Sequence, residues 1–185
     1  RIATLQDSDE AAIPDPAGGG GFTGVARQGS TSGYALGNMP YLNNYVNKYS
    51  LTSDGNASDV LDLSLKRGHV GGNAGPTHGY STGGANSSDT ARIDKFPFAS
   101  DDNATDVGGL TAGRQYVGSS SGDTHGYTNG GGPTESDVID KFAFASDGDA
   151  TDVGNLVQAT KELANGMLNS LTDGYAAGGR TPSYL

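Results

Sequence analysis

The chain repeats itself about every 47 residues. Tyr34, Tyr80, Tyr127 and Tyr175 each follow a glycine and precede a run of small residues, and they are 46, 47 and 48 residues apart. A period in this range is typical of arrays in which each repeat is one supersecondary unit that packs only on its neighbours. This constraint on the fold is much stronger than any constraint on the function.

A longer motif recurs between these tyrosines. It reads RIDKFPFASDDNATDVGGL from Arg92, VIDKFAFASDGDATDVGNL from Val138 and, in a more divergent copy, VNKYSLTSDGNASDVLDL from Val46. Apolar and polar residues alternate over six to eight positions, which predicts strands, and Asp, Asn and Gly then predict turns. A repeat of this length with several short strands and a Gly-Gly pair is typical of a propeller blade. The sequence therefore predicts an all-β fold.

The two ends of the chain resemble two halves of one more repeat. The last copy stops after GYAAGGRTPSYL, and the chain begins RIATLQDSDEAAIPDP, which is similar to RIDKFPFASDDNATDV with one gap. We expect a single propeller domain over 1–185 whose terminal segments share one blade and close a ring. Its four blade-equivalents are about 34–79, 80–126, 127–173, and 174–185 plus 1–33.

Other assemblies are compatible with the same repeat. Two chains could join into a larger ring of seven or eight blades, or repeats could stack in a fibre. The segment 156–168 also has apolar residues at helical spacing, although its register within the repeat favours a strand. Because Arg1 is an unusual first residue, we expect the numbering to start at a cut site or after an omitted residue.

Composition excludes several classes of function. Only 34% of residues are hydrophobic and 31 are glycine, so the fold must depend on extensive backbone pairing. The formal net charge of −10 opposes binding to nucleic acid or to an anionic membrane. No apolar run is long enough to span a membrane, and there is no cysteine.

The repeated strings IDKFPFASDDNATDVGGL and IDKFAFASDGDATDVGNL, each coupled to THGYSTGG or THGYTNGG, resemble a kelch-like repeat family of marine cyanophage virion proteins. The resemblance covers about residues 30–180 and is most specific over Arg92–Asp152. It implies a phage particle protein built of kelch-like propeller blades. The blade tryptophan of ordinary kelch repeats is absent, and Phe96 and Phe142 are candidates to replace its packing.

The acidic turns are the candidate sites that recur most clearly. Their oxygen ligands have a spacing that could hold calcium, but no glutamate stands at the twelfth position of an EF-hand loop. The favoured interpretation is that these side chains cap their own turns. We expect no catalytic, cofactor-binding or metal-binding residues and no cofactor. The residues of these turns that could bind calcium are Asp54, Asn56, Asp59, Asp101, Asn103, Asp106, Asp147, Asp149 and Asp152.

Two other residue types recur without pointing to chemistry. His78 and His125 lie in different repeats, and the remaining copies carry Ser32 and Asp173 at that position, which argues against a shared metal. Lys48, Lys95 and Lys141 recur beside an aromatic residue, as expected for an outward-facing lysine on a strand.

The sequence and the resemblance together favour a non-enzymatic structural protein on the phage surface. The first hypothesis is a knob-like capsid decoration protein that contacts the major capsid protein or other virion proteins. The alternative is a tail-fibre or receptor-binding module for host surface glycans, with Tyr41, Tyr45 and Tyr116 as candidate contacts. A polysaccharide-cleaving enzyme is the weakest hypothesis. Homo- or hetero-oligomers are compatible with all three, and the chain is expected at the virion surface.

Overall fold

The computed structural model describes residues 31–38, 43–162, 167–170 and 172–181, and this part of the chain is all-β without a helix. The prediction of an all-β fold is thus confirmed. The strands are β1 (Ser32–Asn38), β2 (Asn43–Ser50), β3 (Ser58–Asp62), β4 (Gly71–Ala74), β5 (His78–Thr82), β6 (Arg92–Pro97), β7 (Thr105–Gly109), β8 (Gly118–Ser121), β9 (His125–Asn129), β10 (Ser136–Ala143), β11 (Thr151–Thr160), β12 (Met167–Asn169) and β13 (Gly174–Ala176).

The strands form antiparallel sheets in which chain neighbours pair. Sheet 1 has the order β1-β2-β3, sheet 2 the order β4-β5-β6-β7 and sheet 3 the order β8-β9-β10-β11, while β12 and β13 form a separate hairpin. The Gly-Tyr motifs at Tyr80 and Tyr127 lie in β5 and β9, the second strands of the two four-stranded sheets, whereas Tyr34 lies in β1 of sheet 1 and Tyr175 in β13 of the hairpin. The sequence repeats counted from Tyr80 and Tyr127 therefore do not coincide with the sheets. The first strand of each four-stranded sheet, β4 or β8, belongs to the end of the preceding sequence repeat.

Corresponding strands share their register, and this explains the glycine of each Gly-Tyr pair. Gly79 lies opposite Phe96, and Gly126 lies opposite Phe142. A Cβ atom on either glycine would come within 2.3 Å of the ring of its partner. The aromatic ring therefore lies over a backbone without a side chain, a cross-strand arrangement that glycine permits and alanine does not.

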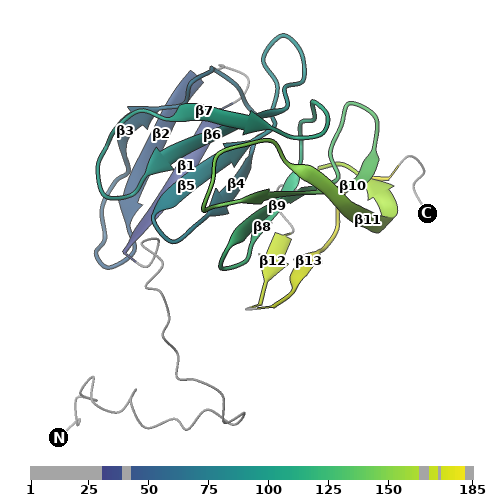
Figure 1. Ribbon diagram of the computed structural model, residues 1–185. Coiled ribbons are helices and arrows are strands. Elements are labelled where there is room, and N and C mark those ends of the chain that lie inside the picture. The colour runs from purple at the N-terminus through teal and green to yellow at the C-terminus, as the bar shows by residue number, and fades with distance from the viewer. Residues whose placement is uncertain (1–30, 39–42, 163–166, 171, 182–185) are drawn as a thin grey trace, which may run out of the picture.

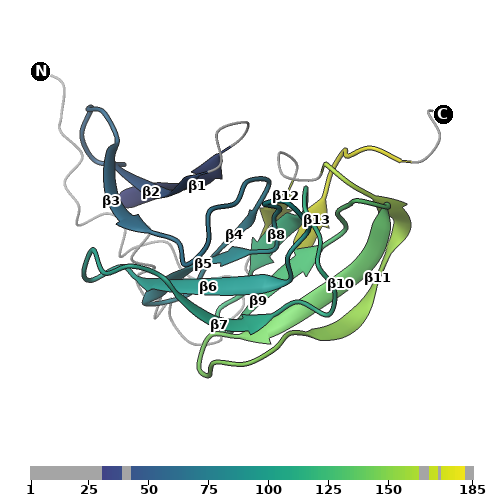
Figure 2. The same cartoon turned by 90° about the horizontal axis from the view of Figure 1, so that it is seen from above.

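Sheets 2 and 3 lie side by side with their first strands, β4 and β8, next to each other (Figures 1 and 2). The Asn73 side chain on β4 donates to the carbonyl of Ser120 on β8 at 2.6 Å. No sheet closes on itself within the described residues. The expected ring closure involves residues 1–30 and 182–185, which lie outside the described part of the chain.

The cores lie between neighbouring sheets. The first core contains Val46 and Leu61 of sheet 1 and Leu63 directly after β3. They pack against Phe96 on β6 and against Phe98 and Ala104 in the segment between β6 and β7. The next interface has the same construction. It joins Tyr80, Ile93 and Leu110 to Phe142 and Ala150.

The rings of Phe96 and Phe142 are almost fully buried, at 1% and 4% exposure. Each of the two rings therefore lies in the core between two neighbouring sheets.

The helical interpretation of residues 156–168 is wrong over its first part. Residues 151–160 form β11, which pairs with β10 up to Asn155 and again at Thr160, with a register shift between these two positions. Residues 156–160 are thus extended, as the register within the repeat predicts. The remaining residues of the helical pattern include 163–166, which lie outside the described residues.

Candidate functional site

A buried arginine–aspartate pair connects each sheet to the next. Arg67 follows β3, and its guanidinium lies 2.8 Å from the carboxylate of Asp94 on β6, with both side chains fully buried. Arg67 also donates to the carbonyls of Gly83 and Ser81. Burial lowers the pKa of Arg67, and the charge of Asp94 opposes this shift. The second interface repeats the arrangement with Arg114 and Asp140.

The buried aspartates also bind the backbone of the preceding repeat. The two oxygens of Asp94 accept from the amide and hydroxyl of Ser64, at 2.9 and 2.5 Å. Asp140 accepts from the amide and hydroxyl of Thr111 in the same way, at 3.1 and 2.7 Å. Each aspartate is therefore fully satisfied, which a buried charge requires. A proton-transfer role would need a carboxylate open to a substrate.

The acidic turns contact the last two strands of the preceding sheet. Lys48 pairs with Asp101 at 3.2 Å, and Lys95 pairs with Asp147 at 2.7 Å. Beside these ion pairs, the amide of Ala104 donates to the carbonyl of Asp62 at 2.8 Å. The corresponding bond runs from Ala150 to the carbonyl of Gly109, also at 2.8 Å.

Turn side chains complete the same junctions. Asn103 accepts from the amide of Asp62, and Asp149 accepts from the amide of Gly109, each at 2.9 Å. The recurring turn sequence thus joins one repeat to the next. The sequence pattern indicated outward lysines and self-capping turns, and it missed this contact. Each lysine lies 53 or 52 residues before its aspartate, one repeat away, and neither residue type by itself indicates such a contact.

The other residues of the nine candidates occupy surface positions. Asp106 forms an ion pair with Arg92 at 2.8 Å, and Asp152 accepts from the amide of Gly154 at 3.0 Å. Asp54, Asn56 and Asp59 are exposed. In the ranges that the structure describes, no group of three or more histidine, cysteine, aspartate or glutamate side chains is arranged to hold a metal ion.

The histidines are distributed over different sheets. The Nδ1 atoms of His78 and His125 each lie 2.8 Å from the hydroxyl of the preceding threonine. Burial, followed by the charge of Lys95, lowers the pKa of His78. His69 stacks on Tyr116 with ring centroids 3.9 Å apart. The structure therefore does not bring these imidazoles together.

The tyrosines predicted as glycan contacts have different environments. Tyr45 on β2 is 48% exposed, and Tyr49 on the same strand is 41% exposed. Tyr116 is partly buried against His69. Tyr41 lies outside the described residues.

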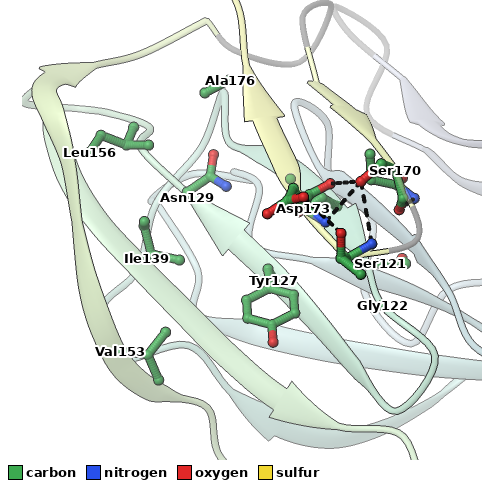
Figure 3. Close-up of a pocket in the computed structure, with 14 residues that line it drawn as sticks. Ser121, Gly122, Tyr127, Asn129, Ile139, Val153, Leu156, Ser170, Asp173 and Ala176 are labelled. Atoms are coloured by element: carbon green, nitrogen blue, oxygen red, sulfur yellow. Dashed lines mark hydrogen bonds between the residues drawn. The ribbon is translucent and has the colours of Figure 1, made fainter. Parts of the chain in front are cut away.

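A cavity of about 390 Å³ lies between sheet 3 and the β12–β13 hairpin (Figure 3). Tyr127, Ile139, Val153 and Leu156 line it from sheet 3, and Asp173 and Ala176 line it from the hairpin side. Ser170 in the hairpin turn accepts hydrogen bonds from the amides of Thr172 and Asp173. Among the described lining residues, Asp173 is the one carboxylate.

No protein-family model matches the chain, and no curated protein matches it. No helix within the described ranges is long and apolar enough to cross a membrane.

Proposed function

We propose that the protein is a non-enzymatic structural protein of a phage particle, most specifically a knob-like decoration on the capsid surface. The observation that carries the proposal is the use of the recurring charged residues. Lys48, Lys95, Arg67 and Arg114 all bind residues of the next repeat or its turn. The polar chemistry of the repeat thus serves assembly of the array.

The sequence resemblance to cyanophage virion repeats supports the viral assignment. On this proposal the protein lies on the virion surface, and its partner is the major capsid protein or another virion protein. The acidic surface is consistent with this location, since net charge keeps a densely displayed protein from associating with nucleic acid or anionic lipid.

The arrangement of the sheets supports a kelch-like, four-bladed ring as the finer description of the fold. Sheets 2 and 3 are four-stranded antiparallel meanders, and their first strands are adjacent. In a propeller, the first strands of the blades surround a central channel in this way.

One observation favours the alternative, a tail-fibre or receptor-binding module for host surface glycans. Tyr45 and Tyr49 are four residues apart on β2, so they lie on the same face of the strand, and both are exposed. Exposed aromatic rings on one face could stack on sugar rings.

Copy number distinguishes the two functions. In purified virions, quantitative gel densitometry against the major capsid protein should give many tens to hundreds of copies of a decoration protein per particle. A number of a few to a few tens would contradict the decoration function. In that case Tyr45→Ala and Tyr49→Ala should weaken binding to host glycans if the alternative holds.

A further inference from the structure

The cavity beside sheet 3 has the lining of half an interface core. In the core between sheets 2 and 3, Phe142 and Ala150 of the later repeat pack against four residues of the earlier one. These are Tyr80, Ile93 and Val107 in sheet 2 and Leu110 directly after β7. The equivalent residues of sheet 3, one period later, are Tyr127, Ile139, Val153 and Leu156, and all four line the cavity. Val153 is 46% exposed. In the described residues, sheet 3 therefore lacks the aromatic partner that completes the other two cores.

The strand next to this cavity, β13, has one edge without a partner strand among the described residues. β13 pairs with β12 and, within the described ranges, with no second strand. Its counterparts β5 and β9 each pair on both sides. Tyr175 at the centre of β13 is 54% exposed. An edge of this kind readily accepts another strand.

The polar half of the junction is present at the same place. Lys141 is the counterpart of Lys48 and Lys95, which pair with the acidic turn of the next repeat. Lys141 has no ion-pair partner among the residues that the structure describes. The position therefore fits a hairpin that carries a large apolar side chain in its first strand and an aspartate in its turn.

We propose that the segment Arg1–Asp15 of the same chain binds here as the third and fourth strands of the last sheet. This inference rests on the ring architecture given under the proposed function. The segment reads RIATLQDSDEAAIPD, with Leu5 at the position of Phe96 and Asp9 in the acidic turn. Leu5 enters the cavity beside Tyr127, and Asp9 pairs with Lys141.

The register of the other sheets fixes the pairing. Gly79 lies opposite Phe96 and Gly126 opposite Phe142, so Gly174 lies opposite Leu5. Two residues further along β13, Ala176 then lies opposite Ala3. Directly opposed residues of an antiparallel pair have Cα atoms about 4.5–5.5 Å apart, a separation that a disulfide can bridge.

A cysteine pair tests the proposal in a chain that has no cysteine of its own. The full-length double variant Ala3→Cys/Ala176→Cys should form an intramolecular disulfide under mild oxidation, seen as a faster monomer band on a non-reducing gel. The matched control Ala3→Cys/Ala177→Cys should not, because adjacent strand residues point to opposite faces. Absence of the cross-link, or a cross-linked dimer in which a second copy supplies the segment, would overturn the proposal.

A second measurement covers the case of a double variant that does not fold. Amide exchange at Gly174 and Ala176, whose amides face the edge of β13 away from β12, should be slow in the native chain and should become fast in Leu5→Asp, which places a charge in the cavity. Unchanged exchange in Leu5→Asp would overturn the proposal. Neither result bears on copy number per particle, so failure of this inference is distinguishable from failure of the proposed decoration function.

Discussion

Removal of the negative charge from Asp94 should destabilise the protein far more than the same change at an exposed ion pair. Asp94→Asn keeps the shape of the side chain but leaves the fully buried guanidinium of Arg67 without a counter-charge. Loss of one partner of a buried pair costs about 3–5 kcal/mol. The amide also accepts less well than a carboxylate from Ser64, which donates two hydrogen bonds to Asp94.

The matched control is Asp101→Asn in the exposed pair with Lys48, whose side chains are 52% and 31% exposed. Exposed pairs of this kind contribute less than about 1 kcal/mol. In urea unfolding followed by circular dichroism, the midpoint of Asp94→Asn should fall by about 1.5–2.5 M for an m-value of about 2 kcal/mol/M. The midpoint of the control should move by less than about 0.5 M.

A second variant keeps this prediction testable if Asp94→Asn does not fold. Arg67→Met/Asp94→Leu removes both charges and should be more stable than Asp94→Asn, because neither charge is then left buried and unpaired. The reasoning is refuted if Asp94→Asn is as stable as Asp101→Asn. It is also refuted if the double variant is less stable than Asp94→Asn.

Three further predictions concern the interface cores. Gly126→Ala should lower the free energy of unfolding by about 1–3 kcal/mol in urea, because its Cβ would come within 2.3 Å of the Phe142 ring. The control Gly55→Ala, where a Cβ meets no atom within 4 Å, should leave the free energy of unfolding nearly unchanged. Phe142→Ala should lower the free energy of unfolding by about 3–5 kcal/mol, and a loss under about 1 kcal/mol would contradict its central position. Burial raises the pKa of the Tyr80 phenol from 10.0 to about 12, so the unfolded chain releases this proton first and stability should fall as pH rises from 10 to 12. Tyr80→Phe should reduce that pH dependence in urea midpoints measured across the range, and an unchanged slope would show that Tyr80 does not cause it.

The repeat made the all-β architecture predictable from sequence. Alternation in IDKFPF and IDKFAF determines which residues of β6 and β10 enter a core, and the turn residues after them determine where these strands end. The helical spacing after Leu156 was misleading, whereas the position of this segment within the repeat correctly predicted the strand over 156–160.

The junctions were much less predictable. Asp94 and Asp140 follow an apolar residue and precede a lysine, a pattern that an exposed strand position also produces. Their burial depends on Arg67 and Arg114, which approach from the preceding repeat. Contacts between residues in different repeats follow from the geometry of neighbouring sheets, and a single sequence carries no direct signal of that geometry.

Amide hydrogen exchange at Ala104 and Ala150 tests most directly the central claim that each acidic turn joins its sheet to the preceding one. Both amides lie just after a turn but donate to the preceding repeat, at the carbonyls of Asp62 and Gly109. They should exchange as slowly as the paired amides of β6 and β10, while the exposed turn residue Asp102 exchanges quickly. Equally fast exchange at Ala104, Ala150 and Asp102 would contradict the claim.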